Sequence, residues 1–211
     1  MELTEQAAEI IGILNNTYPD VKTQLNHSSP FQLLVATILS AQCTDKQVNK
    51  VTEELFRELK TPEDFVKTDQ LLLEKLIRPT GYYKNKAKNL KNCANALVQK
   101  YDGVVPDNLE ALISLPGVGR KTANVVLGSA FGIPGIVVDT HVSRISQRLG
   151  LSRNKHPVKI EFDLMKIIPR HQWDSFSLQL IYFGRQYCQA RKPLCKDCPL
   201  YHLCSYPEKT A

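Results

Sequence analysis

The sequence contains no apolar run that approaches the roughly 18 residues of a membrane-spanning helix. Its first twenty residues carry acidic and polar side chains throughout, so they lack the basic and then uninterrupted apolar layout of a secretory signal peptide. The chain also has no internal repeat and no low-complexity tract. These absences argue against membrane, secreted and repeat proteins, and we expect a cytoplasmic globular protein with no membrane partner.

Strand signals are equally scarce. Only "GIVVD" at 135–139 has the character of an extended segment, and it stands alone between helical patterns. Apolar residues recur at helical spacing almost everywhere else, for example over 7–14, 48–59 and 87–98. Side chains suited to start a helix precede several segments, namely Ser29, Thr61 and Asp69. The sequence therefore predicts an all-α protein, in which the almost uniformly apolar helix at 31–41 is central and buried.

Acidic residues are in the minority. The 211 residues include 27 lysines and arginines against 21 aspartates and glutamates, which gives a formal net charge of +6. With 43% hydrophobic residues, the chain can bury a core of its own. A basic balance favours an anionic partner such as a nucleic acid, although alone it does not identify one.

A glycine-containing stretch, "LPGVGRKTA" at 115–123, lacks what a nucleotide site requires. A Walker loop needs glycine immediately before the Lys-Thr pair, and Arg120 stands there instead. A dinucleotide fingerprint needs a third glycine where Thr122 lies, and a preceding strand. What remains is a tight turn between two helices, with "RKTANVVLGSAF" as the second helix.

Such a turn has two possible roles. It can be a plain interhelical connection, or Gly117 and Gly119 can let backbone N–H groups at the helix N-terminus bind a DNA phosphate. Arg120 adds positive charge at the same place. A second basic run with interleaved aromatics lies at 82–91 and contains Lys84, Lys86, Lys88 and Lys91. This run is either a solvated helix face or a second contact with the phosphate backbone.

Lys121 is a candidate nucleophile. It follows Arg120 in the first turn of the expected helix, where the positive end of the helix disfavours an ammonium and so favours a reactive neutral amine. A lysine amine forms Schiff bases with carbonyl carbons, and an opened deoxyribose presents one at C1′. Asp139 begins the next helical pattern, so its default role is an N-cap. Its carboxylate can also stabilise cationic sugar character or accept a proton from the amine.

The C-terminal segment has four cysteines, Cys188, Cys195, Cys198 and Cys204, in the spacing C-x6-C-x2-C-x5-C. Four soft thiolate ligands within 17 residues indicate a metal site. From chemistry alone zinc ranks first, a [4Fe–4S] cluster second and disulfides third, because the spacing matches neither common ferredoxin run. Arg191 and Lys192 lie in the loop between the first two cysteines, where a metal-stapled basic loop can face a phosphate.

Taken together, these motifs resemble the endonuclease III family, the bifunctional DNA glycosylases and AP lyases of the helix-hairpin-helix superfamily. The likeness rests on "LPGVGRKTANVV", "VVDTHVSRISQRLG" and the cysteine spacing, in that order, and it extends to "LLVATILSAQCTDKQVNKV" at 33–51. It covers nearly the whole chain.

The resemblance implies an architecture and a cofactor. It implies two all-α domains with a DNA groove between them: a six-helix domain over 22–132 with the helix-hairpin-helix motif, and a helical domain built from 1–21 and 133–211. In that family the cysteine spacing holds a [4Fe–4S] cluster, which replaces the preference for zinc.

The resemblance also implies roles for single residues. Lys121 matches the nucleophilic lysine and Asp139 the catalytic aspartate, while Gln42 matches the residue that fills the hole left by a flipped nucleotide. Tyr82 is a departure, because the family's Gly-Leu-Tyr reads Gly-Tyr-Tyr here and an aromatic replaces the aliphatic wedge. The other expected DNA-binding residues are Lys84, Leu115, Gly117, Val118, Gly119, Arg120, His141, Arg191 and Lys192. For His141 we expect local structural support of the site.

The implied function is excision of oxidised or saturated pyrimidines from duplex DNA, with cutting 3′ to the abasic site by β-elimination. The expected partner is double-stranded DNA that contains damaged pyrimidines or abasic sites, bound by a monomer in the cytoplasm at the nucleoid. One alternative is a monofunctional glycosylase of the same superfamily, a branch that typically lacks the lysine found here as Lys121. Another is a metal-stapled DNA-binding module without catalytic activity.

Overall fold

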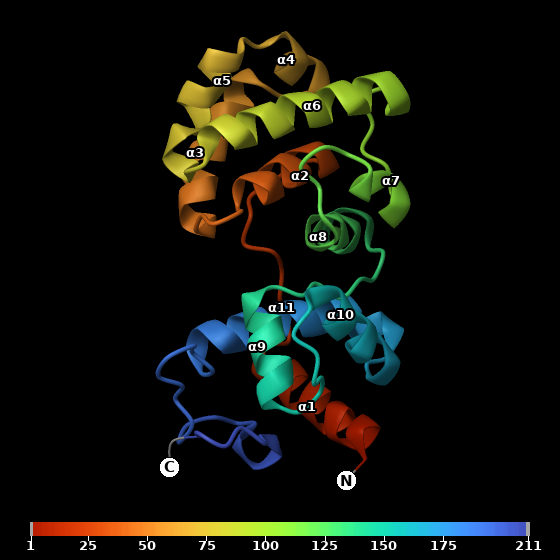
Figure 1. Cartoon of the computed structure of the whole chain (residues 1–211), viewed down its shortest axis with the longest axis vertical. Helices are drawn as coiled ribbons and strands as arrows, with labels where there is room; N and C mark the ends of the chain where they lie inside the picture. Colours follow the sequence, from red (N-terminus) through yellow and green to blue (C-terminus); the bar gives the residue numbers. More distant parts are fainter. Residues whose placement is uncertain (1, 210–211) are drawn as a thin grey trace. The chain divides into compact units, whose positions relative to one another are not determined.

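The computed structural model describes residues 2–209, and within that range every regular element is a helix (Figure 1). The chain divides into two compact units. Residues Thr23–Ile133 form what we call the hairpin unit. The chain up to Lys22 and from Pro134 onward forms the terminal unit. No helix in the described range combines the length and apolar character needed to cross a bilayer.

The hairpin unit contains seven α-helices and one 3₁₀ helix. They are α2 (Pro30–Leu39), α3 (Asp45–Glu58), α4 (Pro62–Lys67), α5 (Gln70–Ile77), η1 (Arg78–Thr80), α6 (Tyr83–Tyr101), α7 (Leu109–Ile113) and α8 (Arg120–Phe131). The resemblance implies six helices over 22–132, one fewer than the α-helices described in this unit. Asp69 starts α5 directly after the short α4, as the sequence predicts, by accepting hydrogen bonds from the N–H groups of Leu71 and Leu72.

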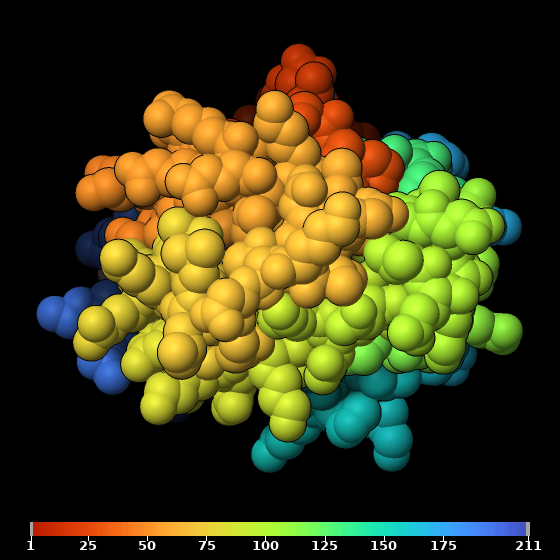
Figure 2. Space-filling model, turned by 90° about the horizontal axis from the view of Figure 1, so that it is seen from above, coloured from red at the N-terminus to blue at the C-terminus, as the bar shows by residue number. Residues whose placement is uncertain are grey.

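Helix α2 lies at the centre of this unit and packs against α8, α6 and α3. It is buried on almost its whole circumference, as its apolar composition predicts. Its start is fixed by Ser29, whose side chain accepts a hydrogen bond from the Gln32 N–H, and by Pro30 at the first helical position. Figure 2 looks onto the hairpin unit, where segments from α3 to α7 (orange to green) form one continuous surface.

The terminal unit joins the two ends of the chain around a second core. Its helices are α1 (Leu3–Thr17), α9 (Thr140–Arg148), α10 (Pro157–Ile167), η2 (Arg170–Gln172), α11 (Trp173–Gln186) and η3 (Tyr201–Leu203). Helix α11 packs against both α9 and α1. The Gln6 side chain of α1 donates hydrogen bonds to the carbonyl oxygens of Leu149 and Leu203, each at 2.9 Å. These bonds fix α1 to the C-terminal end of α9 and to η3.

Candidate functional site

The turn between α7 and α8 has a geometry that only glycine fits. Gly117 has φ +78°, and a Cβ atom at this position would lie 2.8 Å from the Cβ atom of Asn89 on α6. The Val118 N–H closes the turn with a 3.1 Å hydrogen bond to the Leu115 carbonyl oxygen. Both the backbone angle and the close approach therefore exclude a larger residue at Gly117.

Two of the expected DNA-binding residues in this turn face inward. The side chains of Leu115 and Val118 are only 3% and 6% exposed and belong to the core of the hairpin unit. The Val118 N–H is also used within the turn. The expectation that Leu115 and Val118 contact DNA therefore needs correction for their side chains, which anchor the turn because burying them removes apolar surface from water.

Helix α8 starts where the sequence predicts. Gly119 is its N-cap and offers no capping side chain, while the first N–H groups of a helix lack acceptors within that helix. Lys121 lies exposed in this first turn, and Arg120 beside it is partly buried. The turn thus presents an uncapped, positive helix N-terminus with an amine at its edge, an arrangement suited to an anion.

The basic run over 82–91 does not form one surface. Lys84 and Lys88 are exposed. Lys86 is only 5% exposed, and its Nζ atom donates to two backbone carbonyl oxygens. The half-buried Lys91 donates to the carbonyl oxygen of Thr68. Neither a solvated face nor a phosphate contact describes Lys86, because helical geometry turns its side chain toward the rest of the unit.

Gln42 and Tyr82 share an unusual backbone conformation. Both have left-handed backbone angles, with φ 54° at Gln42 and 48° at Tyr82, although neither residue is a glycine. Both side chains are exposed, and that of Tyr82 is 64% exposed. By contrast, Tyr83 packs against the core, with the Arg78 guanidinium 5.8 Å from its ring centre. Left-handed non-glycine residues are uncommon and strained, and they cluster at functional sites.

In the terminal unit, Asp139 is the N-cap of α9, as the sequence predicts. Its Oδ1 atom accepts hydrogen bonds from the N–H groups of His141 and Val142, each at 2.8 Å. Its Oδ2 atom lies 3.1 Å from Nδ1 of the His141 ring. Both carboxylate oxygens are therefore held in place, and His141 contacts the carboxylate directly.

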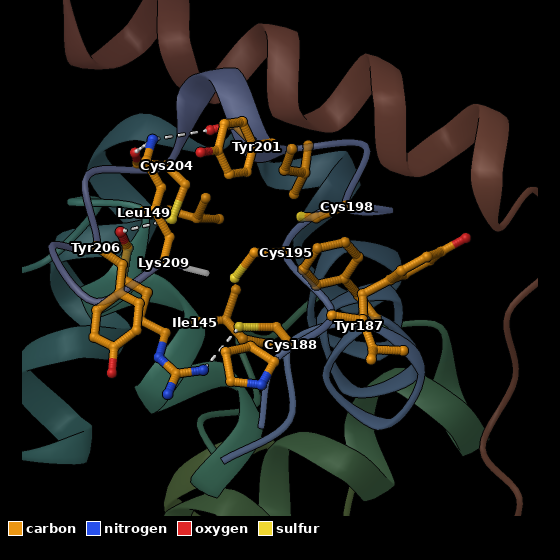
Figure 3. Close-up of a pocket in the computed structure, with 15 residues that line it drawn as sticks. Ile145, Leu149, Tyr187, Cys188, Cys195, Cys198, Tyr201, Cys204, Tyr206 and Lys209 are labelled. Carbon is orange, nitrogen blue, oxygen red and sulfur yellow. Dashed lines mark hydrogen bonds between the residues drawn. The ribbon is translucent and has the colours of Figure 1, made fainter. Parts of the chain in front are cut away.

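The four cysteines line a single pocket of the terminal unit (Figure 3). Their neighbours there are mostly apolar and aromatic, including Ile145, Leu149 and Phe183. None of the four cysteines forms a disulfide bond. Within the described range, no three His, Cys, Asp or Glu side chains form a group that could hold a single metal ion. Arg191 and Lys192 are exposed on the loop that leads from Cys188 to Cys195.

The chemistry of this pocket suits a metal group bound through sulfur. Burial raises the pKa of Cys198 to about 11, and burial likewise raises the pKa of Cys204. Thiolates are the ligating form of cysteine, so binding of a metal group here would release the thiol protons. One sulfur already has a cationic donor, since Arg148 Nη1 lies 3.2 Å from the Cys188 Sγ atom.

Two features of these surroundings were not predicted from the sequence. One is the burial of Lys86, although the sequence carries a signal for it: Lys86 precedes Leu90 by one helical turn and so lies on the apolar stripe of α6. The other is the left-handed backbone of Gln42 and Tyr82, which has no sequence signal because neither residue is glycine or asparagine. Lys121 and Asp139 belong to different units.

Comparison with known proteins identifies relatives of nearly the full chain. The family model described as "HhH-GPD superfamily base excision DNA repair protein" matches residues 35–170. The sequence is 52% identical to endonuclease III of Synechocystis over 201 residues, which cover 95% of this chain and 92% of that protein. It is 46% identical to endonuclease III of Bacillus subtilis over 197 residues, which cover 93% of this chain and 90% of that protein.

Two solved structures are similar in fold as well as in sequence. A non-covalent endonuclease III–DNA complex matches with a TM-score of 0.93 and 46% identity, covering 97% of this chain and 96% of that one. A trapped endonuclease III–DNA covalent intermediate, the estranged-adenine complex, matches with a TM-score of 0.93 and 46% identity over 97% of both chains.

Proposed function

The chain belongs to the endonuclease III family within the HhH-GPD superfamily of base excision DNA repair proteins, and on that basis we propose how its residues act on damaged DNA. It is a DNA glycosylase and AP lyase: it removes oxidised pyrimidines from duplex DNA and cuts the strand at the abasic site. The observation that carries the assignment of residues is the exposed Lys121 amine in the first turn of α8, next to the glycine turn.

Lys121 supplies the nucleophile. Its amine nitrogen attacks C1′ of the damaged nucleotide, and the bond from C1′ to the base breaks with its electron pair leaving on the base, which then takes a proton. The sugar ring opens to give a Schiff base between Lys121 and C1′. Loss of a proton from C2′ expels the 3′ phosphate oxygen, which cuts the strand, and water then releases the lysine. An enzyme that works in this way forms a covalent DNA intermediate.

Asp139 acts on charge and protons in the same reaction. Its Oδ1 atom is engaged by two backbone N–H groups and its Oδ2 atom by His141, so the carboxylate enters the reaction in a fixed orientation. A fixed negative charge stabilises the cationic character that develops on the sugar as the base leaves. The same carboxylate can accept the proton that the Lys121 ammonium must lose before it attacks.

The remaining residues grip and open the duplex. The N–H groups at the start of α8, with Gly117, Gly119 and Arg120, bind a backbone phosphate, and the exposed Lys84 adds charge on the same unit. Arg191 and Lys192 bind phosphate from the cysteine loop. Gln42 fills the space left by the flipped nucleotide, and Tyr82 stacks in the opposite strand. Extrusion is easier for a damaged pyrimidine because it stacks weakly.

We propose that a [4Fe–4S] cluster is held, as in other members of the family, by the four cysteines Cys188, Cys195, Cys198 and Cys204. When bound, the cluster supplies one iron for each cysteine thiolate and so ties the loop to the helices around it. The chain's own contribution is the apolar pocket, together with Arg148, which donates a hydrogen bond to Cys188 Sγ. We place the enzyme in the cytoplasm at the nucleoid, where its substrate lies.

A borohydride trapping assay tests this function. Sodium borohydride added during turnover on a duplex with an oxidised pyrimidine should reduce the Schiff base and leave the wild-type protein joined to DNA. Lys121→Ala should lose both the adduct and strand cutting while it binds the duplex nearly as well, because the backbone N–H groups remain. Lys75→Ala, which removes an exposed lysine of α5, is the matched control and should trap like the wild type. An adduct of wild-type yield with Lys121→Ala would refute the assignment of the nucleophile.

A further inference from the structure

Lys86 is a buried cation that the reaction does not use. It lies at the end of the first turn of α6, and its side chain is 5% exposed. Lysine is almost never fully buried unless its charge is satisfied. Here the Nζ atom donates to the carbonyl oxygen of Leu39 at 2.8 Å and to that of Thr80 at 2.7 Å. Burial lowers the pKa of Lys86, so the protein bears a cost to keep an ammonium there.

The two acceptors have the same structural character. Leu39 is the last residue of α2 and Thr80 is the last residue of η1. Carbonyl groups at a helix C-terminus lack partners within the helix and carry partial negative charge. One ammonium therefore caps the C-terminal ends of two separate elements and holds both carbonyl oxygens within hydrogen-bonding distance of one nitrogen atom.

Each capped end leads directly into a left-handed, exposed residue. Gln42 follows Leu39 by three positions, and Tyr82 follows Thr80 by two. The backbone N–H of Lys86 also donates to the Tyr82 carbonyl oxygen at 3.0 Å. Strained backbone conformations of this kind persist only where the surrounding structure fixes them strongly. Lys86 is the residue whose side chain contacts the segments that precede both.

We propose that Lys86 is a positioning residue, which fixes the spacing between the loop that carries Gln42 and the loop that carries Tyr82 so that both side chains enter the duplex together. This inference rests on the proposed function of Gln42 and Tyr82. Lys86 itself does not contact DNA. Its loss changes how the duplex is opened, whereas the chemistry at Lys121 on an already unpaired abasic site is unaffected.

The test compares Lys86→Met with Lys91→Met. Methionine is similar in length but can neither donate to the carbonyl oxygens nor carry charge. Lys91 is the matched control, because it lies on the same helix and donates to a helix-end carbonyl oxygen, that of Thr68, which leads to neither loop. Lys86→Met should lower kcat/KM on a duplex lesion about tenfold, a loss at the lower end of what a stacking contact supplies. Cutting of a single-stranded abasic oligonucleotide should stay within about twofold of wild type, and Lys91→Met should match wild type on both substrates.

A spectroscopic readout separates positioning from general destabilisation. With 2-aminopurine opposite the lesion, wild type and Lys91→Met should change its fluorescence on binding as the base loses its normal stacking, and Lys86→Met should not. In a Gln42→Ala, Tyr82→Ala background, Lys86→Met should have little further effect, because the residues it positions are gone. If Lys86→Met does not fold, Lys86→Arg and Lys86→Gln replace it, and only the arginine, which keeps the charge, should retain most of the duplex reaction.

Two results would overturn the proposal. One is an equal loss on the duplex and the single-stranded substrates, which would make Lys86 a purely structural residue. The other is an undiminished effect of Lys86→Met in the Gln42→Ala, Tyr82→Ala background. Failure of the proposed function is distinguishable from both, because wild type itself would then release no base and cut no strand.

Discussion

Gly184 of α11 packs so closely against His141 of α9 that a Cβ atom at position 184 would lie 2.8 Å from the His141 Cδ2 atom. The Nδ1 atom of the same ring lies 3.1 Å from Oδ2 of Asp139. The imidazole is therefore held between a neighbouring helix and the carboxylate that we assign to catalysis. A glycine inside a helix is unfavourable by itself, so its place here reflects the close approach of the ring.

We expect Gly184→Ala to displace His141 and with it the Asp139 carboxylate. A methyl group at this position would also lie 2.9 Å from the Ile145 Cδ1 atom, so the ring cannot move without further adjustment. Single-turnover base release should fall several-fold while duplex affinity changes little. The control is Gly12→Ala in α1, where the added Cβ meets nothing within 4 Å. That variant should gain about 0.5–1 kcal/mol in stability and keep full activity. Full activity in Gly184→Ala would show that the ring does not position the carboxylate.

Asp139→Asn separates the two roles of this side chain. Asparagine caps a helix as well as aspartate does, so the unfolding free energy should change little. It carries no charge, and base release should fall by roughly 10²–10³-fold if the carboxylate stabilises the developing sugar cation. Asp139→Ala should lose the cap as well and cost about 0.5–2 kcal/mol in stability. Chemical denaturation together with single-turnover kinetics measures both effects, and normal base release by Asp139→Asn would exclude the electrostatic role.

Tyr82→Ala should weaken lesion binding roughly ten- to hundredfold, because stacking of an aromatic ring on a base is worth about 1–3 kcal/mol. Its melting temperature should stay the same, since the Tyr82 side chain is 64% exposed. Tyr83→Ala is the natural comparison and should show the reverse, because Tyr83 packs against the core of the hairpin unit. Equilibrium binding to lesion and intact duplexes, with thermal melts of each variant, decides the matter. Unchanged lesion affinity in Tyr82→Ala would remove it from the DNA contact.

The freshly purified protein should contain about four iron atoms per chain, one for each cysteine ligand, and should be yellow-brown. Cys198→Ser should lower the iron content and weaken duplex binding, because the loop with Arg191 and Lys192 loses its support. Cys93→Ser controls for general effects of cysteine replacement, since Cys93 is buried in the other unit and is no ligand in this proposal. Metal analysis that finds stoichiometric zinc and no iron would exclude the cluster.

The sequence by itself determined the features that depend on neighbouring residues. Ser29, Thr61, Asp69 and Asp139 each accept a hydrogen bond from an N–H group at most three residues away, so their capping roles can be predicted from the order of residue types. The same holds for the turn before α8, where the glycines and the helical pattern lie within one short segment.

Only the tertiary structure decided which side chains are buried and which distant residues come into contact. The carbonyl oxygen of Leu39 meets the Lys86 ammonium across 47 positions of the chain, and Gly184 meets His141 across two helices. Leu115 and Val118 turn inward because burying them in the core of the hairpin unit removes apolar surface from water. Such contacts depend on how whole helices pack, and no local pattern of residues records that packing.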